Sequence, residues 1–319
     1  MQKRVLIIDE MHESIIPLLT NEGFLVDYKP KINRSEILES ICAYDGLIIR
    51  SKTPMDRALL EKAEKLEFIG RAGAGLDQID LSYLEERGIK LYNAPEGNRD
   101  AVGEQAIGSL LALFNHVKKA DREVRKGIWD REGNRGEELS GKTVGVFGFG
   151  YMGQAFARKL LGFDVKILAY DKYKKGFGDG FIDEVDLEEL QKEADVLSIH
   201  VPLTSETRGF FSLDFLQKFA KPIYLVNTAR GEVISFEVLN EALESGIIRG
   251  AVLDVLENEK FDTFSISQKK SFEKLAQREN VLFSPHIAGW TFQSYEKINQ
   301  VLVKKIRIGS TKQEHNNFS

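Results

Sequence analysis

Short apolar runs alternate with amphipathic segments along most of this 319-residue chain, and this alternation limits the fold more than any other feature of the sequence. The apolar runs are rich in β-branched residues, which favours strands, and the segments between them have the apolar spacing of helices. In the first part of the chain, the predicted strands are residues 5–8, 24–26, 46–49, 68–69 and 89–92. The predicted helices are residues 12–22, 34–42, 56–65 and 81–87. Strands that alternate with helices form parallel sheets that are covered on both faces.

The alternation is interrupted once and then resumes. Residues 100–120 have the spacing of one long helix, and residues 121–141 are polar and rich in glycine. A helix is predicted at about 152–162, and a last helix at about 291–309 follows the second sheet, so we expect it to pack on the first domain. The strands predicted for the second sheet are residues 143–147, 165–170, 196–200, 223–226, 251–255 and 281–283. The sequence therefore predicts an α/β protein of two doubly wound parallel-sheet domains.

The length agrees with this organisation, because about 150 residues per domain gives roughly two domains. Since the last helix returns to the first domain, the second domain is predicted to be inserted into it. The predicted boundaries are residues 1–98 with 287–319 for the discontinuous domain and residues 99–286 for the inserted one.

Composition excludes several classes of function. The formal net charge of -5 argues against non-specific binding to nucleic acid, so no nucleic-acid partner is expected. No apolar run is long enough to span a membrane or to form a signal-peptide core, so no membrane partner is expected either. Cys42 is the single cysteine, which excludes an internal disulfide framework and a multi-cysteine zinc site. We predict no bound metal and a cytoplasmic location.

A glycine-rich motif directly follows the first strand of the inserted domain. Gly148, Gly150 and Gly153, with Tyr151 and Met152 between the last two, form G-x-G-x-x-G between a predicted strand and a predicted helix. This context is that of the dinucleotide-binding fingerprint. The glycines permit a tight turn and a close approach of the pyrophosphate, while the helix N-terminus supplies N–H donors.

An acidic residue supports that interpretation. Asp171 ends the next predicted strand, 18 residues after Gly153. Its carboxylate is expected to accept the ribose hydroxyls of adenosine and to repel a 2′-phosphate, so NAD is predicted over NADP. Three lysines that follow it soften this preference, namely Lys172, Lys174 and Lys175.

Three further blocks end or follow predicted strands of the second sheet, where ligands bind in open α/β folds. They are Asn227-Thr228-Ala229-Arg230-Gly231, Leu253-Asp254-Val255-Leu256-Glu257-Asn258-Glu259 and Ser284-Pro285-His286-Ile287-Ala288-Gly289. By these blocks, their order and their spacing, the chain resembles the D-isomer-specific 2-hydroxyacid dehydrogenase family over about residues 4–309. Within that family, the blocks at residues 69–77 and 49–51 are most similar to D-3-phosphoglycerate dehydrogenases, in a short form without a C-terminal regulatory domain.

The chemistry of that family needs a hydride, a proton and a cation for the substrate carboxylate. His286 is the predicted acid/base, because imidazole titrates near neutrality. Glu259 is expected to orient it and to raise its pKa, and Arg230 is expected to bind the carboxylate and polarise the carbonyl. The resemblance thus implies a Rossmann NAD-binding domain inserted into a flavodoxin-like substrate-binding domain, acting on a small 2-hydroxy or 2-keto acid.

The resemblance also implies which residues contact the ligands. For the cofactor, besides the glycine-rich motif and Asp171, they are His200, Val201, Pro202, Thr207, Thr228, Ala229 and Asp254. For the substrate they are Arg50, Ser51, Gly73, Ala74 and Gly75.

Several substrates remain open at this stage. A 3-phosphoglycerate/3-phosphohydroxypyruvate enzyme of serine biosynthesis is favoured by four cations expected to gather near the predicted site, Arg50, Lys52, Arg71 and Arg99. Hydroxypyruvate or glyoxylate reduction is the second interpretation and D-lactate dehydrogenase the third, whereas formate dehydrogenase is disfavoured because its relatives have glutamine where Glu259 stands. A non-enzymatic alternative is an NAD-sensing protein similar to the corepressors that share this fold.

Two positions differ from the usual family pattern. Lys260 stands where a proline is common, and residues 260–270 are predicted to be a flexible loop. Trp290 stands where many relatives have serine, so its ring is expected either to narrow the substrate pocket or to pack between domains. The family also implies a homodimer formed through the NAD-binding domain, by about residues 100–140, where Ile128 and Trp129 are hard to explain in a monomer.

Overall fold

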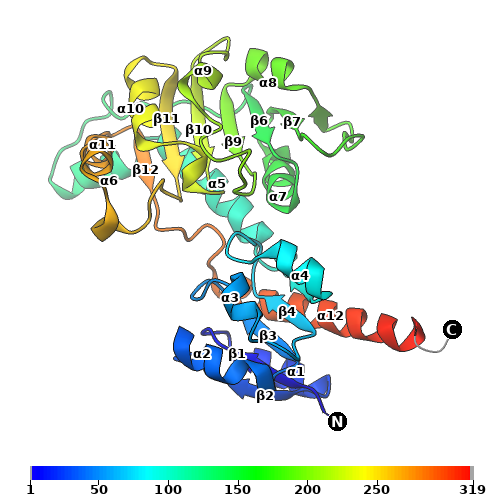
Figure 1. Cartoon of the computed structure of the whole chain (residues 1–319). Coiled ribbons are helices and arrows are strands. Elements are labelled where there is room, and N and C mark those ends of the chain that lie inside the picture. The colour runs from blue at the N-terminus through cyan, green and yellow to red at the C-terminus, as the bar shows by residue number, and fades with distance from the viewer. Residues whose placement is uncertain (1, 317–319) are drawn as a thin grey trace. The chain divides into compact units, whose positions relative to one another are not determined.

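The computed structural model describes residues 2–316 and divides the chain into two compact units (Figure 1). Unit 1 is Met1–Asn98 with Trp290–Ser319, and unit 2 is Arg99–Gly289. The second crossing between units thus follows residue 289, whereas the sequence placed it after residue 286. Residues 317–319 of the predicted first domain lie outside the described residues.

Unit 1 contains a five-stranded parallel sheet in the order β2-β1-β3-β4-β5, which is the flavodoxin-like order. Side chains alternate between its faces, so Val5 and Ile7 of β1 pack with α1 and α12, while Leu6 packs on the opposite face with α2, α3 and α4. The strands are β1 (Arg4–Ile7), β2 (Leu25–Tyr28), β3 (Gly46–Ile49), β4 (Phe68–Arg71) and β5 (Lys90–Asn93). The helices are α1 (Ile15–Asn21), α2 (Arg34–Ser40), α3 (Arg57–Leu60), α4 (Leu81–Arg87) and α12 (Phe292–Asn316), with 3-10 turns at Ile41–Ala43 and Pro95–Gly97.

Unit 2 contains a seven-stranded parallel sheet in the order β12-β11-β10-β9-β6-β7-β8, which includes the Rossmann order. One face packs against α5 and α7 and the other against α8, α9, α10 and α11. The strands are β6 (Thr143–Phe147), β7 (Lys166–Tyr170), β8 (Ile182–Glu184), β9 (Val196–Ile199), β10 (Ile223–Asn227), β11 (Ile248–Leu253) and β12 (Val281–Phe283). The helices are α5 (Arg99–Phe114), α6 (Val117–Arg125), α7 (Tyr151–Lys159), α8 (Leu187–Glu193), α9 (Leu213–Leu216), α10 (Phe236–Glu244) and α11 (Ile266–Ala276), with 3-10 turns at Leu160–Gly162, Gly231–Val233 and Phe261–Thr263.

The predicted single helix over residues 100–120 is wrong, because the chain breaks between α5 and α6. His116 has a left-handed backbone, with φ 51°. The carbonyl of Phe114 accepts from the backbone N–H of Glu137 at 3.1 Å, and the side chain of Asn115 donates to the carbonyl of Leu111. Polar groups of a distant loop and of a side chain therefore replace the helical ladder at this point.

The flexible loop predicted over residues 260–270 is also wrong. Ser265 caps α11 by accepting from the backbone N–H of Gln268, whose side chain accepts in return from the N–H of Ser265. Phe264 and Phe272 pack against the buried Phe236, with ring centroids 5.7 and 5.6 Å from it. A capping box and an aromatic cluster thus order a segment that looked polar in sequence.

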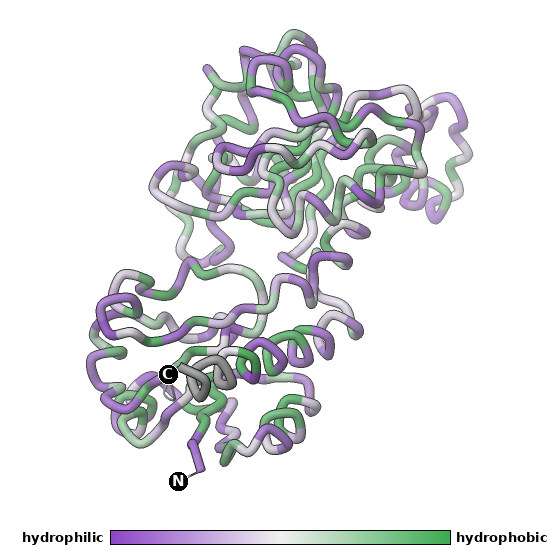
Figure 2. The backbone as a smooth tube through the Cα atoms, turned by 90° about the vertical axis from the view of Figure 1, so that its right-hand side faces the viewer, coloured by the Kyte–Doolittle hydropathy of each residue, from purple (hydrophilic) through white to green (hydrophobic). Residues whose placement is uncertain are grey.

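Hydrophobic segments concentrate inside each unit and hydrophilic turns lie on its outside (Figure 2). Among residues 2–316, no helix has the length and the apolar character needed to cross a membrane.

Candidate functional site

The glycine-rich turn joins β6 to α7. Gly148 has φ +98°, and a Cβ there would lie 2.8 Å from the carbonyl oxygen of His200. A Cβ at Gly153 would lie 2.1 Å from the carbonyl oxygen of Gly148, so both positions require glycine. At Gly150, by contrast, an added Cβ would meet nothing within 4 Å. The turn is therefore closed toward the sheet and open at the start of the helix.

The N-terminus of α7 has no side-chain cap. Its N-cap residue is Gly150, whereas α2, α8 and α10 are capped by the side chains of Asn33, Asp186 and Ser235. A helix start of this kind can direct its first N–H groups and the positive end of its dipole toward an anion, and here α7 begins at Tyr151. An open, uncapped helix start behind two obligatory glycines fits the pyrophosphate of a dinucleotide.

Asp171 follows β7 and binds backbone N–H groups of the glycine-rich turn and of the segment directly after Asp171. One oxygen accepts from Phe149 at 2.8 Å, and the other accepts from Tyr173 and Lys174 at 2.9 Å each. Burial opposes ionisation of Asp171, but these N–H groups and the charge of Lys174 outweigh it and lower its pKa. These three hydrogen bonds occupy three of the roughly four lone-pair sites of the carboxylate, which leaves one for a ribose hydroxyl.

Two buried polar atoms have no hydrogen-bond partner among the described residues: Nδ1 of His200, whose carbonyl lies against Gly148, and Oγ1 of Thr228, in the loop after β10. Burial lowers the pKa of His200 to about 3, so its ring is neutral, and Nε2 lies 2.8 Å from the hydroxyl of Ser198. Orphaned donors and acceptors at predicted cofactor positions fit a polar ligand. The neighbouring predicted residues Val201, Pro202 and Thr207 lie in the loop after β9, where the Thr207 hydroxyl donates to the Pro202 carbonyl at 2.7 Å.

Three predicted catalytic residues meet at the carboxyl edge of the second sheet. Nδ1 of His286 lies 2.9 and 3.1 Å from the two carboxylate oxygens of Glu259. This hydrogen bond, opposed by burial, raises the pKa of His286. Burial works against the Glu259 carboxylate, but His286 outweighs it and lowers the pKa of Glu259. The charge of Arg230 acts on both groups, stabilising the carboxylate and opposing the imidazolium.

The loop after β10 orients Arg230 and is set by the fully buried Asn227. The side chain of Asn227 donates to the carbonyl of Arg230 at 2.9 Å and accepts from the N–H of Ala229 at 3.0 Å. Gly231 then approaches Leu256 so closely that a Cβ would lie 1.8 Å from its carbonyl oxygen. This contact joins the segment of Arg230 to the segment that ends at Glu259.

Lys260, which replaces the family proline, does not loosen the segment after Glu259. Its N–H donates to the side chain of Asn258 at 2.9 Å, and its carbonyl accepts from the hydroxyl of Thr263 at 2.8 Å. Side-chain hydrogen bonds therefore supply the restraint that a proline ring would give.

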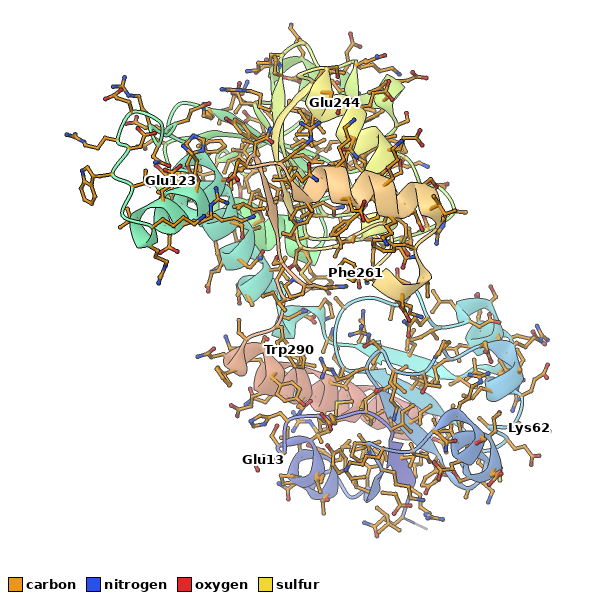
Figure 3. The ribbon with its side chains drawn as sticks, turned by 90° about the vertical axis from the view of Figure 1, so that its left-hand side faces the viewer. Glu13, Lys62, Glu123, Glu244, Phe261 and Trp290 are labelled. Carbon is orange, nitrogen blue, oxygen red and sulfur yellow. The ribbon has the colours of Figure 1, made fainter. Side chains whose placement is uncertain are left out.

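Arg50 of unit 1 stacks on aromatic rings of the same unit. Its guanidinium lies 4.1 Å from the ring centroid of Trp290 and 5.3 Å from that of Tyr295. Trp290, labelled in Figure 3, precedes α12 and is half-exposed. Burial of Arg50 lowers its pKa, partly offset by Tyr295 and Asp9. The structure thus places the ring of Trp290 on Arg50, a contact that the sequence did not predict.

Of the four cations in the predicted cluster, Lys52 is held by backbone carbonyls. Its ammonium donates to the carbonyls of Ile8, Pro30 and Ile32 at 2.5, 2.8 and 2.8 Å, which uses all three of its protons. Arg71 donates to the carbonyl of Ala72 at 2.8 Å, and Arg99 begins α5 in unit 2.

The remaining predicted substrate residues lie in loops after β3 and β4. They are Ser51, Gly73, Ala74 and Gly75, and the carbonyl of Ala74 accepts from the side chain of Asn93 at 3.0 Å. No cluster of three or more potential metal ligands occurs within the part of the chain that the structure describes.

A Rossmann sheet with this turn and an imidazole–carboxylate pair is typical of nicotinamide-dependent dehydrogenases. The NAD-binding domain of the D-isomer specific 2-hydroxyacid dehydrogenases matches residues 107–288. The chain therefore belongs to the D-isomer-specific 2-hydroxyacid dehydrogenase family, as predicted, and is an NAD-dependent oxidoreductase.

Three relatives illustrate the range of the family. The chain is 37% identical to a hydroxypyruvate reductase of Thermotoga maritima, over 95% of this chain and 97% of the relative. It is 35% identical to a D-3-phosphoglycerate dehydrogenase of Methanocaldococcus jannaschii, over 95% of this chain but 57% of the relative. The structure matches D-lactate dehydrogenase from Aquifex aeolicus, complexed with NAD and lactic acid, with a TM-score of 0.82 and 25% identity, over 98% and 96% of the two chains.

Proposed function

We propose that this enzyme interconverts a small 2-keto acid and its D-2-hydroxy acid, with His286 as the acid/base. The observation that carries this proposal is the hydrogen bond between His286 and Glu259 beside the charge of Arg230. The carboxylate of Glu259 accepts the hydrogen bond from Nδ1–H of His286. The Nε2–H of the imidazolium is then left to give its proton to the substrate carbonyl oxygen. Arg230 binds the substrate carboxylate and polarises the carbonyl. When bound, NADH supplies the hydride.

The remaining residues serve binding. Gly148, Gly150 and Gly153 with the N-terminus of α7 hold the pyrophosphate, and Asp171 holds the ribose. His200, Thr228 and the other predicted cofactor residues of unit 2 line the nicotinamide end. In unit 1, Arg50, Ser51 and the backbone of residues 73–75 take part in substrate binding.

We propose an unphosphorylated acid, hydroxypyruvate or glyoxylate, ahead of 3-phosphohydroxypyruvate. Lys52 carries this choice, because its three protons are taken by carbonyls and none is left for a phosphate. The 37% identity to a hydroxypyruvate reductase supports it. Serine biosynthesis is therefore the second candidate and D-lactate oxidation the third.

The test is NADH oxidation with hydroxypyruvate, glyoxylate, pyruvate and 3-phosphohydroxypyruvate, compared by kcat/KM. A higher kcat/KM for hydroxypyruvate or glyoxylate supports the proposal. A preference of about 100-fold for the phosphorylated acid would instead assign the enzyme to serine synthesis. NADH binding without turnover of any of these acids would favour the NAD-sensing alternative.

The acid/base role has its own test. His286→Ala should lower kcat by at least about 100-fold, because general acid–base catalysis contributes that much or more. NADH binding, followed by fluorescence, should persist. A variant with the parental rate would refute the role of His286.

We also propose a cytoplasmic homodimer that associates through unit 2. Trp129 is 79% exposed and Ile128 is 48% exposed, and both follow α6. Apolar side chains this exposed favour burial against a second copy. Light scattering should give twice the chain mass of 36.1 kDa, and Trp129→Glu should shift it toward one chain. A single-chain mass at all micromolar concentrations would overturn the dimer.

A further inference from the structure

Asp254, placed directly after β11, holds the segment that carries His286. The residue is 1% exposed. One carboxylate oxygen accepts from the hydroxyl of Ser284 at 2.5 Å and from the N–H of Ile287 at 3.0 Å, and the other accepts from the N–H of Ala288 at 2.8 Å. The backbone carbonyl of Asp254 accepts from the N–H of His286 at 2.7 Å. A single buried residue thus binds four donors of the 284–288 segment.

The backbone of His286 explains why such restraint is needed. Its φ is 55°, in the left-handed region that residues with a Cβ rarely adopt. A left-handed residue turns successive N–H groups toward one point, where an anion stabilises them. Here the N–H groups of Ile287 and Ala288 converge on the carboxylate of Asp254. The carboxylate therefore favours the conformation that the side chain of His286 opposes.

A residue distant in sequence directs the Ser284 hydroxyl. Nε2 of Gln105, on α5, donates to Oγ of Ser284 at 2.9 Å. Because this oxygen accepts from Gln105, its own proton points to Asp254. The amide oxygen of Gln105 is buried and has no hydrogen-bond partner among residues 2–316. Directing the amide nitrogen to Ser284 therefore costs the free energy of leaving that oxygen desolvated and unpaired.

We propose that Gln105 and Ser284, acting through Asp254, are positioning residues that fix the left-handed backbone of His286 and so keep its ring on Glu259. This proposal rests on the acid/base function proposed for His286. Gln105 donates to the Ser284 hydroxyl, and that hydroxyl donates to Asp254, so these two side-chain hydrogen bonds act on the pair of His286 and Glu259 only through Asp254.

The experiment compares Ser284→Ala and Gln105→Met with Ser284→Thr, which keeps the hydroxyl. Ser212→Ala is the matched control, because it removes a serine hydroxyl that caps α9 in the same unit. In Ser284→Ala and Gln105→Met, kcat for hydroxypyruvate or glyoxylate reduction should fall about 10- to 100-fold, as expected when a reacting group is misplaced. The dissociation constant of NADH should not change, and Ser284→Thr should restore most of the rate.

The pH profile separates positioning from simple destabilisation. Glu259 raises the pKa of His286, so a ring that leaves Glu259 loses its proton at lower pH. The alkaline decline of kcat/KM for reduction should therefore move to lower pH in Ser284→Ala and Gln105→Met, but not in Ser212→Ala. Folding is checked for each variant by its circular dichroism spectrum.

Two results would overturn the positioning role proposed for Gln105 and Ser284. One is that both variants keep the parental kcat and pH profile. The other is that the rate falls only as NADH binding weakens, which would place the effect on the cofactor. Failure of the underlying function is recognised separately, since only that failure leaves His286→Ala fully active.

Discussion

Gly231 provides a direct test of how closely the two catalytic segments must approach. A Cβ at this position would lie 1.8 Å from the carbonyl oxygen of Leu256 and 2.6 Å from the N–H nitrogen of Glu257. Both obstacles are backbone atoms, which cannot rotate away. Ordinary van der Waals contact needs about 3.4 Å, so Gly231→Ala must separate the segments of Arg230 and Glu259 by about 1.6 Å.

The expected cost follows from that displacement. A misplacement of about 1 Å can lower activity by about 100-fold, so kcat/KM of Gly231→Ala should fall by at least that factor. Overpacking a buried site also costs about 1–3 kcal/mol, so the free energy of unfolding should fall by that amount.

The assay pairs steady-state NADH oxidation with urea denaturation. Gly162→Ala is the control, because an added Cβ there would meet nothing within 4 Å and the residue lies in the same unit. The control should keep the parental kcat/KM and stability. If Gly231→Ala retained parental kcat/KM while folded, the close contact would not be needed for the alignment of Arg230 and Glu259.

Three further predictions concern the charges. Because Glu259 raises the pKa of His286, Glu259→Gln should lower that pKa. In pH profiles of kcat/KM, reduction should then decline at lower pH and oxidation should begin at lower pH. Profiles at the parental pH would contradict the electrostatic role of Glu259. Trp290→Leu removes a cation–π contact of Arg50 worth about 0.5–1 kcal/mol, so KM for the keto acid should rise about 2- to 5-fold while KM for NADH stays constant. Lys52→Met leaves three carbonyls without their donor, so urea denaturation should show a loss of about 1 kcal/mol or more, with no change in the ratio of kcat/KM between phosphorylated and unphosphorylated acids.

Most of the fold was predictable because buried strands and helices have distinct periodicities. Val5 and Ile7 face one layer of helices and Leu6 the other, which is the pattern of a parallel strand covered on both sides. The three-residue strand β8 was missed because only Ile182 in it is buried, so it forms no apolar run. The break at His116 was missed because it depends on a hydrogen bond from Glu137, which local sequence does not reveal.

The site was predictable where local geometry fixes the residue type. Gly148 and Gly153 are required by contacts within the turn itself, so a short motif suffices to find them. The carbonyls that hold Lys52 were not predictable, because Ile8 follows β1 whereas Pro30 and Ile32 follow β2, and local sequence does not bring these two segments to residue 52. The restraint of His286 by Asp254 was missed for a similar reason, since its hydrogen bonds span more than thirty residues.

The discontinuity of unit 1 has a consequence for synthesis on the ribosome. One face of its sheet, including Val5 and Ile48, is buried by Leu302 and Ile306 of α12, which are translated only after all of unit 2. At about 5–20 residues per second, the N-terminal segment waits roughly 10–40 s with only α1 available to cover this face, before α12 is made. Unit 2 is continuous and can fold during this interval. The nascent N-terminal segment is therefore the part of the chain most in need of chaperone protection, although it is made first.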